Sequence, residues 1–339
     1  MASRPKLTEV AELAGVSIGT ASQALNNKIG VAPETRQRVL EAAQKLGYLQ
    51  YSPSRFNPNI STVGVLMKHP KDDPDIVNPF YSYVLAGAER ECQRHNLSLM
   101  YASIEVDEFS RALSWPPMLS EQQVDGLLIV GAFLEPTISQ ISEQAGLPIV
   151  LVDGYAYNND CDRVVTDNVN GAFAAVNYLI DQGHRHIGLI GSDANAYPSI
   201  RERRKGYTRA LKTHEISKQY IEDSILERES AYAATVRLLE RAPQITAIFA
   251  CNDDTAIACM KAAREMGRRL PDDLSVIGFD DIDLAQEIVP TLTTIHVDKL
   301  LMGAMGVRHL VDRVRDPERA SLTTSLGTQL IIRESVIGI

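Results

Sequence analysis

The sequence has 339 residues, of which 45% are hydrophobic and 23% are charged. These proportions are typical of soluble globular proteins with two or three domains, and they exclude a disordered, collagen-like or coiled-coil chain. No apolar run approaches the roughly 18–20 residues of a membrane-spanning helix, so we expect no membrane partner, and we also expect no secretory signal. The four cysteines contain no Cys-x-x-Cys pair, which predicts reduced thiols in a cytoplasmic protein without a metal site.

Charge is distributed unevenly along the chain, whose net charge is −9. Residues 1–60 carry seven lysines and arginines against four glutamates, a net charge of +3. The remaining residues carry 27 basic and 39 acidic side chains, a net charge of −12. Because phosphate attraction acts locally, a small basic segment attached to a large acidic body indicates that only this segment meets a polyanion.

Two short helical patterns open the chain. Thr8 is expected to cap a helix over Glu9–Ala14, and Gly15 is expected to end that helix in a tight turn. Ser17 is expected to cap a second helix that runs to about Leu25.

A third helix is predicted over Pro33–Leu46, because proline suits the first helical position and Gly47 follows the last. Two short helices around a glycine-containing turn, braced by a third, are typical of a helix-turn-helix DNA-binding domain. A three-helix bundle of no particular function has the same pattern.

The amino-acid sequence of this segment is more specific than its helical pattern. Leu7–Asn26 and Val31–Tyr48 closely resemble the N-terminal domain of the LacI/GalR family of bacterial transcriptional regulators. The resemblance assigns residues 1–48 to DNA binding. It implies a repressor that binds double-stranded, palindromic operator DNA as a homodimer or tetramer, without a cofactor.

Short polar side chains surround the second and third predicted helices. Hydroxyl and amide groups of this kind suit phosphate oxygens, and such contacts fix the register on DNA without reading its sequence. The candidates are Ser17, Thr20, Ser22, Asn26 and Thr35.

The resemblance places Ile18, Gly19 and Gln23 where base edges are read in the major groove. Glutamine can pair with adenine, and isoleucine can contact a thymine methyl group. The family commonly has arginine where this chain has Gln23, so the usual guanine contact is not expected.

Residues 49–61 are rich in Pro, Asn and Ser, which predicts a linker. In the family this segment forms a hinge helix on DNA and inserts a leucine into the minor groove. Arg55 matches the family's arginine, but the leucine is missing, and Phe56 is the candidate wedge in its place. A tether without regular structure is an equal alternative.

From residue 62 the chain alternates apolar, strand-length runs with helix-length segments. This pattern predicts parallel sheets covered by helices on both faces, and a body of this length predicts two doubly wound α/β subdomains. The predicted strands are Thr62–Met67, Leu97–Ser103, Val124–Val130, Pro148–Asp153, Val164–Asp167, His186–Gly191, Ile245–Asn252 and Leu274–Asp281.

We place the first crossover between the halves at Arg163–Asp167, after an Asn/Asp-rich loop. Returns are expected near Thr293–Val297 and Leu326–Gln329. Subdomain one then comprises about 62–162 plus 297–326, and subdomain two about 163–293 plus 329–339.

The resemblance also covers the body, which is similar to periplasmic-binding-protein-like (type I) effector domains. In that fold a ligand lies between the two halves, outside the carboxyl ends of the strands. The segments that carry the resemblance are Asn78–Tyr81, Val124–Gly126, Pro148–Asp153, Val165–Asn168, Gly183–Gly188, Arg203–Tyr207, Cys251–Asp254 and Val276–Asp281.

The resemblance assigns several polar side chains at strand ends to the ligand. Carboxylates accept hydroxyl hydrogens, an Arg fork binds oxygens, and an aromatic ring stacks on a sugar face. The candidates are Phe80, Asp153, Arg203, Asn252 and Asp280, with Tyr197 and Arg201 as weaker ones. For any single Asp or Asn, a helix N-cap is the competing role.

Enzyme signatures are missing from the sequence. It contains no Gly-x-Gly-x-x-Gly after a strand, no phosphate-binding loop ending in Gly-Lys-Ser/Thr and no Gly-x-Ser-x-Gly turn. We therefore favour a ligand-responsive transcriptional repressor of carbohydrate-utilisation genes. A solute-binding protein of a transporter and an enzyme of the same α/β type are the alternatives.

The candidate ligand residues include two carboxylates and one well-supported cation, Arg203. A phosphorylated ligand would need more positive charge, and a purine would prefer flanking aromatic rings and amides. We therefore expect a neutral mono- or oligosaccharide, with a nucleobase or sugar phosphate as the alternative.

Overall fold

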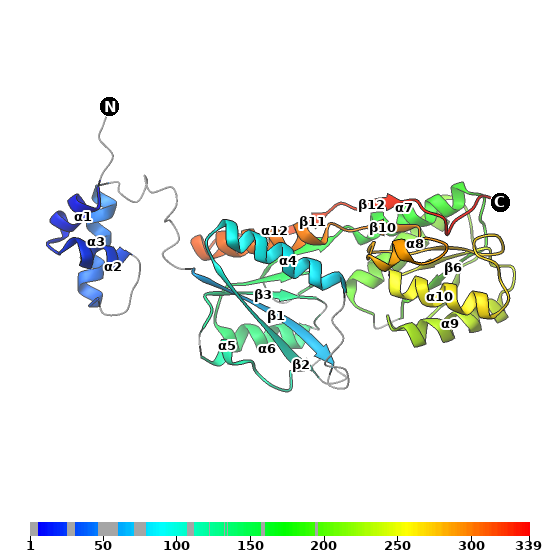
Figure 1. Cartoon of the computed structure of the whole chain (residues 1–339), viewed down its shortest axis with the longest axis horizontal. Coiled ribbons are helices and arrows are strands. Elements are labelled where there is room, and N and C mark those ends of the chain that lie inside the picture. The colour runs from blue at the N-terminus through cyan, green and yellow to red at the C-terminus, as the bar shows by residue number, and fades with distance from the viewer. Residues whose placement is uncertain are drawn as a thin grey trace, which may run out of the picture.

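The computed structural model describes residues 6–25, 31–46, 60–70, 79–106, 112–121, 123–131, 133, 135–156, 160–193 and 196–339. The N-terminal domain consists of α1 (Leu7–Ala14), α2 (Ile18–Leu25) and α3 (Pro33–Lys45), which are labelled in Figure 1. Small apolar side chains from all three helices form its core, among them Val10, Ala21 and Val39.

Most described helix ends of this domain follow the sequence, although α3 ends at Lys45 and not at Leu46. Gly15 adopts a left-handed conformation with a φ of 67° and ends α1. The Ser17 hydroxyl accepts a hydrogen bond of 3.0 Å from the Thr20 amide and caps α2, as predicted. The expected Thr8 cap is wrong, because α1 begins two residues earlier, at Leu7, with Lys6 as its N-cap residue.

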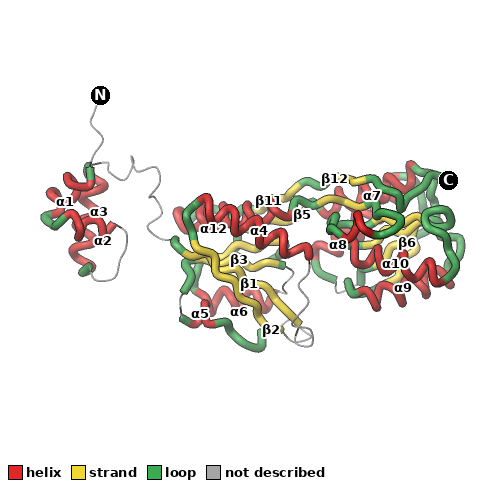
Figure 2. The backbone as a smooth tube through the Cα atoms, in the orientation of Figure 1, coloured by secondary structure: helices red, strands yellow, loops and turns green. Residues whose placement is uncertain are grey.

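Two parallel sheets form the body of the protein (Figures 1 and 2). The strand order of the first sheet is β2 (Ser98–Val106), β1 (Thr62–Pro70), β3 (Gly126–Val130), β4 (Ile149–Val152), β5 (Asp162–Thr166), β11 (Thr323–Leu326). The order of the second is β7 (Tyr220–Glu222), β6 (Ile187–Ile190), β8 (Ala247–Ala250), β9 (Ser275–Ile277). A short antiparallel pair, β10 (Thr294–His296) and β12 (Gln329–Ile331), completes the strands of the described chain.

Helices cover both faces of each sheet, which confirms the predicted α/β class. The first sheet packs against α4 (Pro79–Arg94) and α12 (Lys299–Arg315) on one face, and against α5 (Pro117–Ser120) and α6 (Glu135–Ala145) on the other. The second lies between the pair α7 (Asn168–Asp181) and α8 (Pro198–Thr213) and the pair α9 (Arg228–Arg241) and α10 (Asp253–Glu265). The short α11 (Leu284–Glu287) follows β9. We call each sheet with its helices the first half and the second half of the body.

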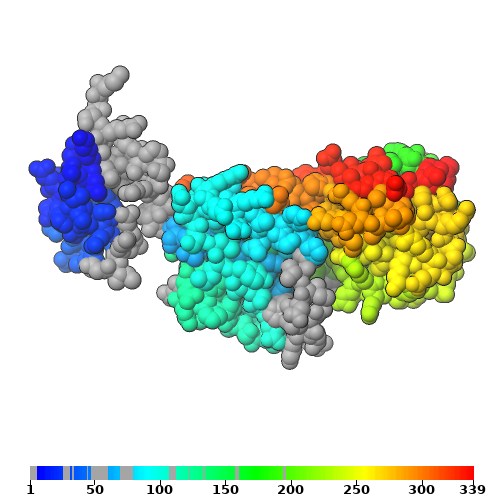
Figure 3. Space-filling view, in the orientation of Figure 1, coloured from blue at the N-terminus to red at the C-terminus, as the bar shows by residue number. Residues whose placement is uncertain are grey.

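The C-terminal part of the chain contributes to both halves. After β10 the chain enters α12, which packs along α4 although more than 200 residues separate them. In the space-filling view, the cyan of α4 and the orange of the α12 region lie side by side on one face (Figure 3).

One predicted crossover is wrong. The strand β5 lies in the first sheet, hydrogen-bonded between β4 and β11, so residues 163–166 belong to the first half. The chain crosses to the second half only after Asp167, where α7 begins. The Asn/Asp-rich stretch before β5 resembles a linker in composition, yet it joins two neighbouring strands of one sheet.

Candidate functional site

The exposed face of α2 carries the residues predicted to read DNA. Ile18 has 51% of its surface exposed, and Gly19 and Gln23 are also exposed. Ala21 and Ala24 lie on the opposite face and pack into the core of the N-terminal domain. The helix therefore presents the predicted reading residues outward.

The predicted phosphate contacts differ in their surroundings. The hydroxyls of Ser17 and Thr20 lie 2.8 Å apart and form a hydrogen bond with each other. Ser22 and Thr35 are half-buried. The remaining candidates, Asn26, Arg55 and Phe56, lie outside the described residues, as does most of the segment 49–61.

Arg203 forms the centre of a buried polar cluster in the body. It lies on the inner face of α8 with 5% of its surface exposed. Its Nε donates to Asn168 Oδ1 at 2.9 Å, and its Nη1 donates to the Cys251 carbonyl at 2.5 Å. Its Nη2 lies 3.0 Å from Asp280 Oδ1 in an ion pair. The guanidinium also lies 3.7 Å from the centre of the Phe279 ring.

Strand ends bring these groups together. Asp153 follows β4, Cys251 follows β8, and Asp280 lies shortly after β9. Asp153 and Asp280 have φ angles of 55° and 111°, which are unfavourable for residues with a side chain. Strained backbone of this kind is concentrated at binding sites, where the surrounding structure holds it in place.

Asp153 supplies a carboxylate from the first half. Its Oδ2 accepts a hydrogen bond of 2.9 Å from the Tyr81 hydroxyl. Burial raises the pKa of Asp153 to about 6, although the positive charge of Arg203 acts in the opposite direction. Burial also raises the pKa of Asp280, against the lowering effect of Arg203 and Lys299. Arg203 therefore interacts with carboxylates of both halves.

Lys299 is a second buried cation beside the cluster. Its Nζ donates to the Asp280 carbonyl at 2.6 Å and to the Asp281 carbonyl at 2.9 Å. A third, longer hydrogen bond of 3.3 Å reaches the Val297 carbonyl. The three hydrogen bonds therefore all go to backbone carbonyls near the crossover from β10 to α12. The ammonium also lies 5.8 Å from the centre of the Phe80 ring.

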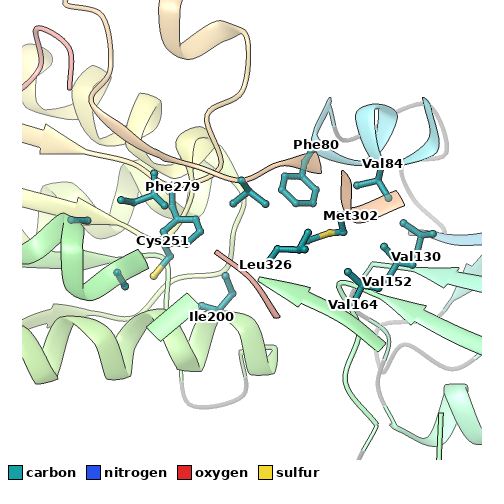
Figure 4. Packing of buried hydrophobic residues seen from close by; sticks show 14 of the residues in the cluster. Phe80, Val84, Val130, Val152, Val164, Ile200, Cys251, Phe279, Met302 and Leu326 are labelled. Carbon is teal, nitrogen blue, oxygen red and sulfur yellow. The ribbon is translucent and has the colours of Figure 1, made fainter. Parts of the chain in front are cut away.

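Further contacts connect the two halves around this cluster. The Lys68 ammonium contacts the Tyr197 hydroxyl and lies 4.2 Å from the centre of its ring. Two tyrosine hydroxyls donate across the boundary, each at 2.7 Å: Tyr155 to Glu202 and Tyr83 to Asp283. Apolar side chains also meet there, and Figure 4 shows Phe80 and Leu326 between Phe279 on one side and Val152 on the other.

The structure thus brings together Phe80, Asp153, Arg203 and Asp280 from the predicted ligand residues, whereas Tyr197 contacts Lys68 of the first half. Asn252 is buried, and its Oδ1 accepts a hydrogen bond of 2.9 Å from the Thr255 amide. It caps α10, the competing role considered for such residues.

Arg201 does not join the cluster. It is exposed on the outer face of α8 and lines a groove with Arg204 and Lys205. Residues two positions apart on a helix point in widely different directions, so Arg203 and Arg201 cannot share one site.

Sequence reasoning missed three members of the cluster. Tyr81 and Asn168 both lie in segments that carry the family resemblance, but of their neighbours only Phe80 was among the predicted ligand residues. Lys299 follows a predicted strand return, and nothing in its local sequence distinguishes it from a solvent-exposed lysine.

The described residues contain neither a metal-binding cluster nor a membrane-spanning helix. No group of three or more His, Cys, Asp or Glu side chains in these ranges could hold a metal ion. Within the same part of the chain, no helix is long and apolar enough to cross a membrane.

Comparison with known proteins relates both parts of the chain to one family. Residues 6–50 match the model of bacterial regulatory proteins of the lacI family. Residues 176–336 match that of the periplasmic binding protein-like domain. The HTH-type transcriptional repressor PurR of Photobacterium profundum is 31% identical, with 97% of this chain and 98% of that protein covered. The ribose operon repressor of Haemophilus influenzae is also 31% identical, with the same coverage.

Solved structures show the same arrangement. A complex of the transcriptional regulator CelR with cellobiose has a TM-score of 0.70 and 29% identity, and covers 98% of this chain and 100% of its own. A LacI family regulator from Enterococcus faecium with bound ribose has a TM-score of 0.69 and 27% identity, over 82% of this chain and 100% of its own. The chain therefore belongs to the LacI family of bacterial regulatory proteins, and it is a DNA-binding transcriptional repressor rather than an enzyme.

Proposed function

We propose that this cytoplasmic repressor is controlled by a neutral mono- or oligosaccharide that binds beside Arg203, between the two halves of the body. The observation that carries the proposal is the buried Arg203 guanidinium, which is ion-paired with Asp280 and whose charge also acts on the buried Asp153 carboxylate of the first half. Carboxylates accept the hydrogens of sugar hydroxyls, and the ring of Phe80 provides an apolar surface for a sugar face.

The charges of the cluster argue against a sugar phosphate. Arg203 is already bound to an amide, a carbonyl and a carboxylate. Lys299 is bound to three backbone carbonyls. Binding a phosphate here would require one of these cations to leave buried acceptors without a donor, which is costly.

A nucleobase is the second candidate, because several relatives are repressors named PurR. A planar base needs aromatic faces on which to stack. The Phe279 ring is covered by the Arg203 guanidinium, the Tyr197 ring lies beside the Lys68 ammonium, and Phe80 packs edge-on against Tyr81. Two relatives with bound sugars, cellobiose and ribose, favour the sugar proposal.

We infer that the sugar acts by linkage. A ligand that contacts both halves favours one relative orientation, and a dimer transmits this orientation to the two DNA-binding domains through residues 49–61. Two domains on a palindromic operator add their contacts, whereas a single domain buries too little surface for high affinity.

The effector class is tested by thermal-shift screening of the full chain. Cellobiose, ribose, further neutral sugars, sugar phosphates and purine bases form the panel, because a ligand of the folded state raises the melting temperature. We expect a neutral sugar to give the shift and Asp280→Asn to abolish it, while Asp272→Asn, an exposed control, keeps it. Stabilisation by a purine or a sugar phosphate alone would refute the sugar proposal and leave the repressor function intact.

The pH dependence of sugar binding should follow Asp153. A hydroxyl donates best to an ionised carboxylate, and a pKa near 6 means that Asp153 becomes protonated as the pH falls through that value. Affinity measured by calorimetry should be about tenfold lower at pH 5 than at pH 7.5. Asp153→Asn should bind more weakly and lose most of this dependence. An unchanged wild-type affinity over this range would exclude Asp153 from the site.

The DNA-reading residues are tested by Gln23→Ala. If Gln23 contacts a base, the substitution should cost about 1–3 kcal/mol on the selected operator and relax the preference at one base pair. Arg38→Ala, on the exposed surface of α3, is the comparison, since loss of a phosphate contact weakens all sequences alike. Operator selection followed by fluorescence anisotropy measures both effects. Unchanged base preference in Gln23→Ala would show that α2 is not the reading helix.

A further inference from the structure

A basic groove runs along the outer face of α8, on the side opposite Arg203. It has a volume of about 620 Å³. Its lining comprises Asp193, Arg201, Arg204, Lys205, Thr208, Arg209, Lys212 and Asp223. Five cations therefore face two carboxylates, within a body whose net charge is −12. Neither the DNA-binding domain nor the cluster around Arg203 uses this charge.

Two of the five cations are held in place by neighbours. Arg204 Nη1 lies 3.2 Å from Asp223 Oδ1 in an ion pair, with both side chains partly exposed. Arg209 donates to Asn170 Oδ1 at 3.1 Å. These contacts fix the direction of two guanidiniums without neutralising the groove.

The other three cations are available to a ligand. Arg201, Lys205 and Lys212 are exposed, and none of their side chains forms an ion pair or hydrogen bond within the described ranges. They follow one another at spacings of four and seven residues, which places them on one face of the helix. Arg201 and Lys205 also line an adjoining hollow, together with Pro198 and Glu202.

The arginine and lysine side chains of the groove favour a ligand that carries phosphate groups. Arginine forks bind phosphate through two parallel hydrogen bonds, and lysine supplies point charges. The volume lies in the range of about 300–1,000 Å³ that is typical of small-molecule sites. The three available cations extend over about three turns of the helix, so a ligand with more than one phosphate contacts more of them than a single phosphate does. We propose that this groove binds a small molecule with two or more phosphate groups, at a site separate from the cluster around Arg203.

Calorimetry of the full chain with inorganic pyrophosphate tests the proposal. We expect binding at low ionic strength, with orthophosphate at least fivefold weaker. The double variant Lys205→Gln/Lys212→Gln should weaken pyrophosphate binding at least tenfold, and Arg201→Gln should weaken it less. The matched control is Lys261→Gln/Arg264→Gln, on the exposed face of α10, and its affinity should stay within twofold of the wild type.

Three results would overturn the proposal. The first is the absence of pyrophosphate binding to the wild type at low ionic strength. The second is equal weakening in the groove variant and in the α10 control, which would indicate non-specific attraction. The third is a groove variant that binds pyrophosphate like the wild type but loses affinity for non-operator duplex DNA, which would make the groove a nucleic-acid surface. None of these outcomes depends on the identity of the sugar.

Discussion

A guanidinium withdrawn from water must have its charge and its donors compensated, and this requirement at Arg203 organises the body of the protein. Removing one partner of a buried ion pair leaves an uncompensated charge, which costs several kcal/mol. The chain meets the requirement with an amide at the start of α7, a carbonyl after β8 and a carboxylate after β9. These three places coincide only if the sheets have the observed strand order. The buried cluster and the fold are therefore specified by the same contacts.

The first half contributes the Asp153 carboxylate to this charge cluster through a longer-range electrostatic interaction with Arg203. Asp153 is buried beside Tyr81, and the positive charge of Arg203 opposes the effect of burial on its pKa. Because Asp153 and Arg203 belong to different halves, their attraction favours the arrangement in which the halves face each other closely. A ligand that supplies hydroxyls between these groups would compete with or extend this attraction, which is the physical basis of the proposed control.

Local rules predicted much of the fold. Ser17 and Gly15 mark the ends of the first two helices because capping depends on neighbouring residues only. Continuous apolar runs predicted the central strands, whose side chains are buried on both faces. The short strand β7 was missed, since three residues give no periodicity. The strand β5 was assigned to the wrong half, because composition does not reveal which neighbours a strand pairs with.

The candidate site was predicted where a residue type and a strand end coincide, as at Asp153 and Asp280. It was not predicted where the role of a residue depends on which face of a helix it occupies or on a partner that is distant in sequence. Arg201 and Arg203 look alike in sequence, and only the face of α8 that packs inward separates them. Lys299 is buried because three carbonyls converge on it from the crossover, an arrangement that exists only after folding.

The central claim is that Arg203 joins the two halves electrostatically through Asp153, and a double-mutant cycle tests it most directly. The unfolding free energies of the wild type, Asp153→Asn, Arg203→Gln and the double variant are measured by urea denaturation at pH 7.5. The account predicts a favourable coupling on the order of 1 kcal/mol between the two sites. Additive effects, within about 0.3 kcal/mol, would contradict it.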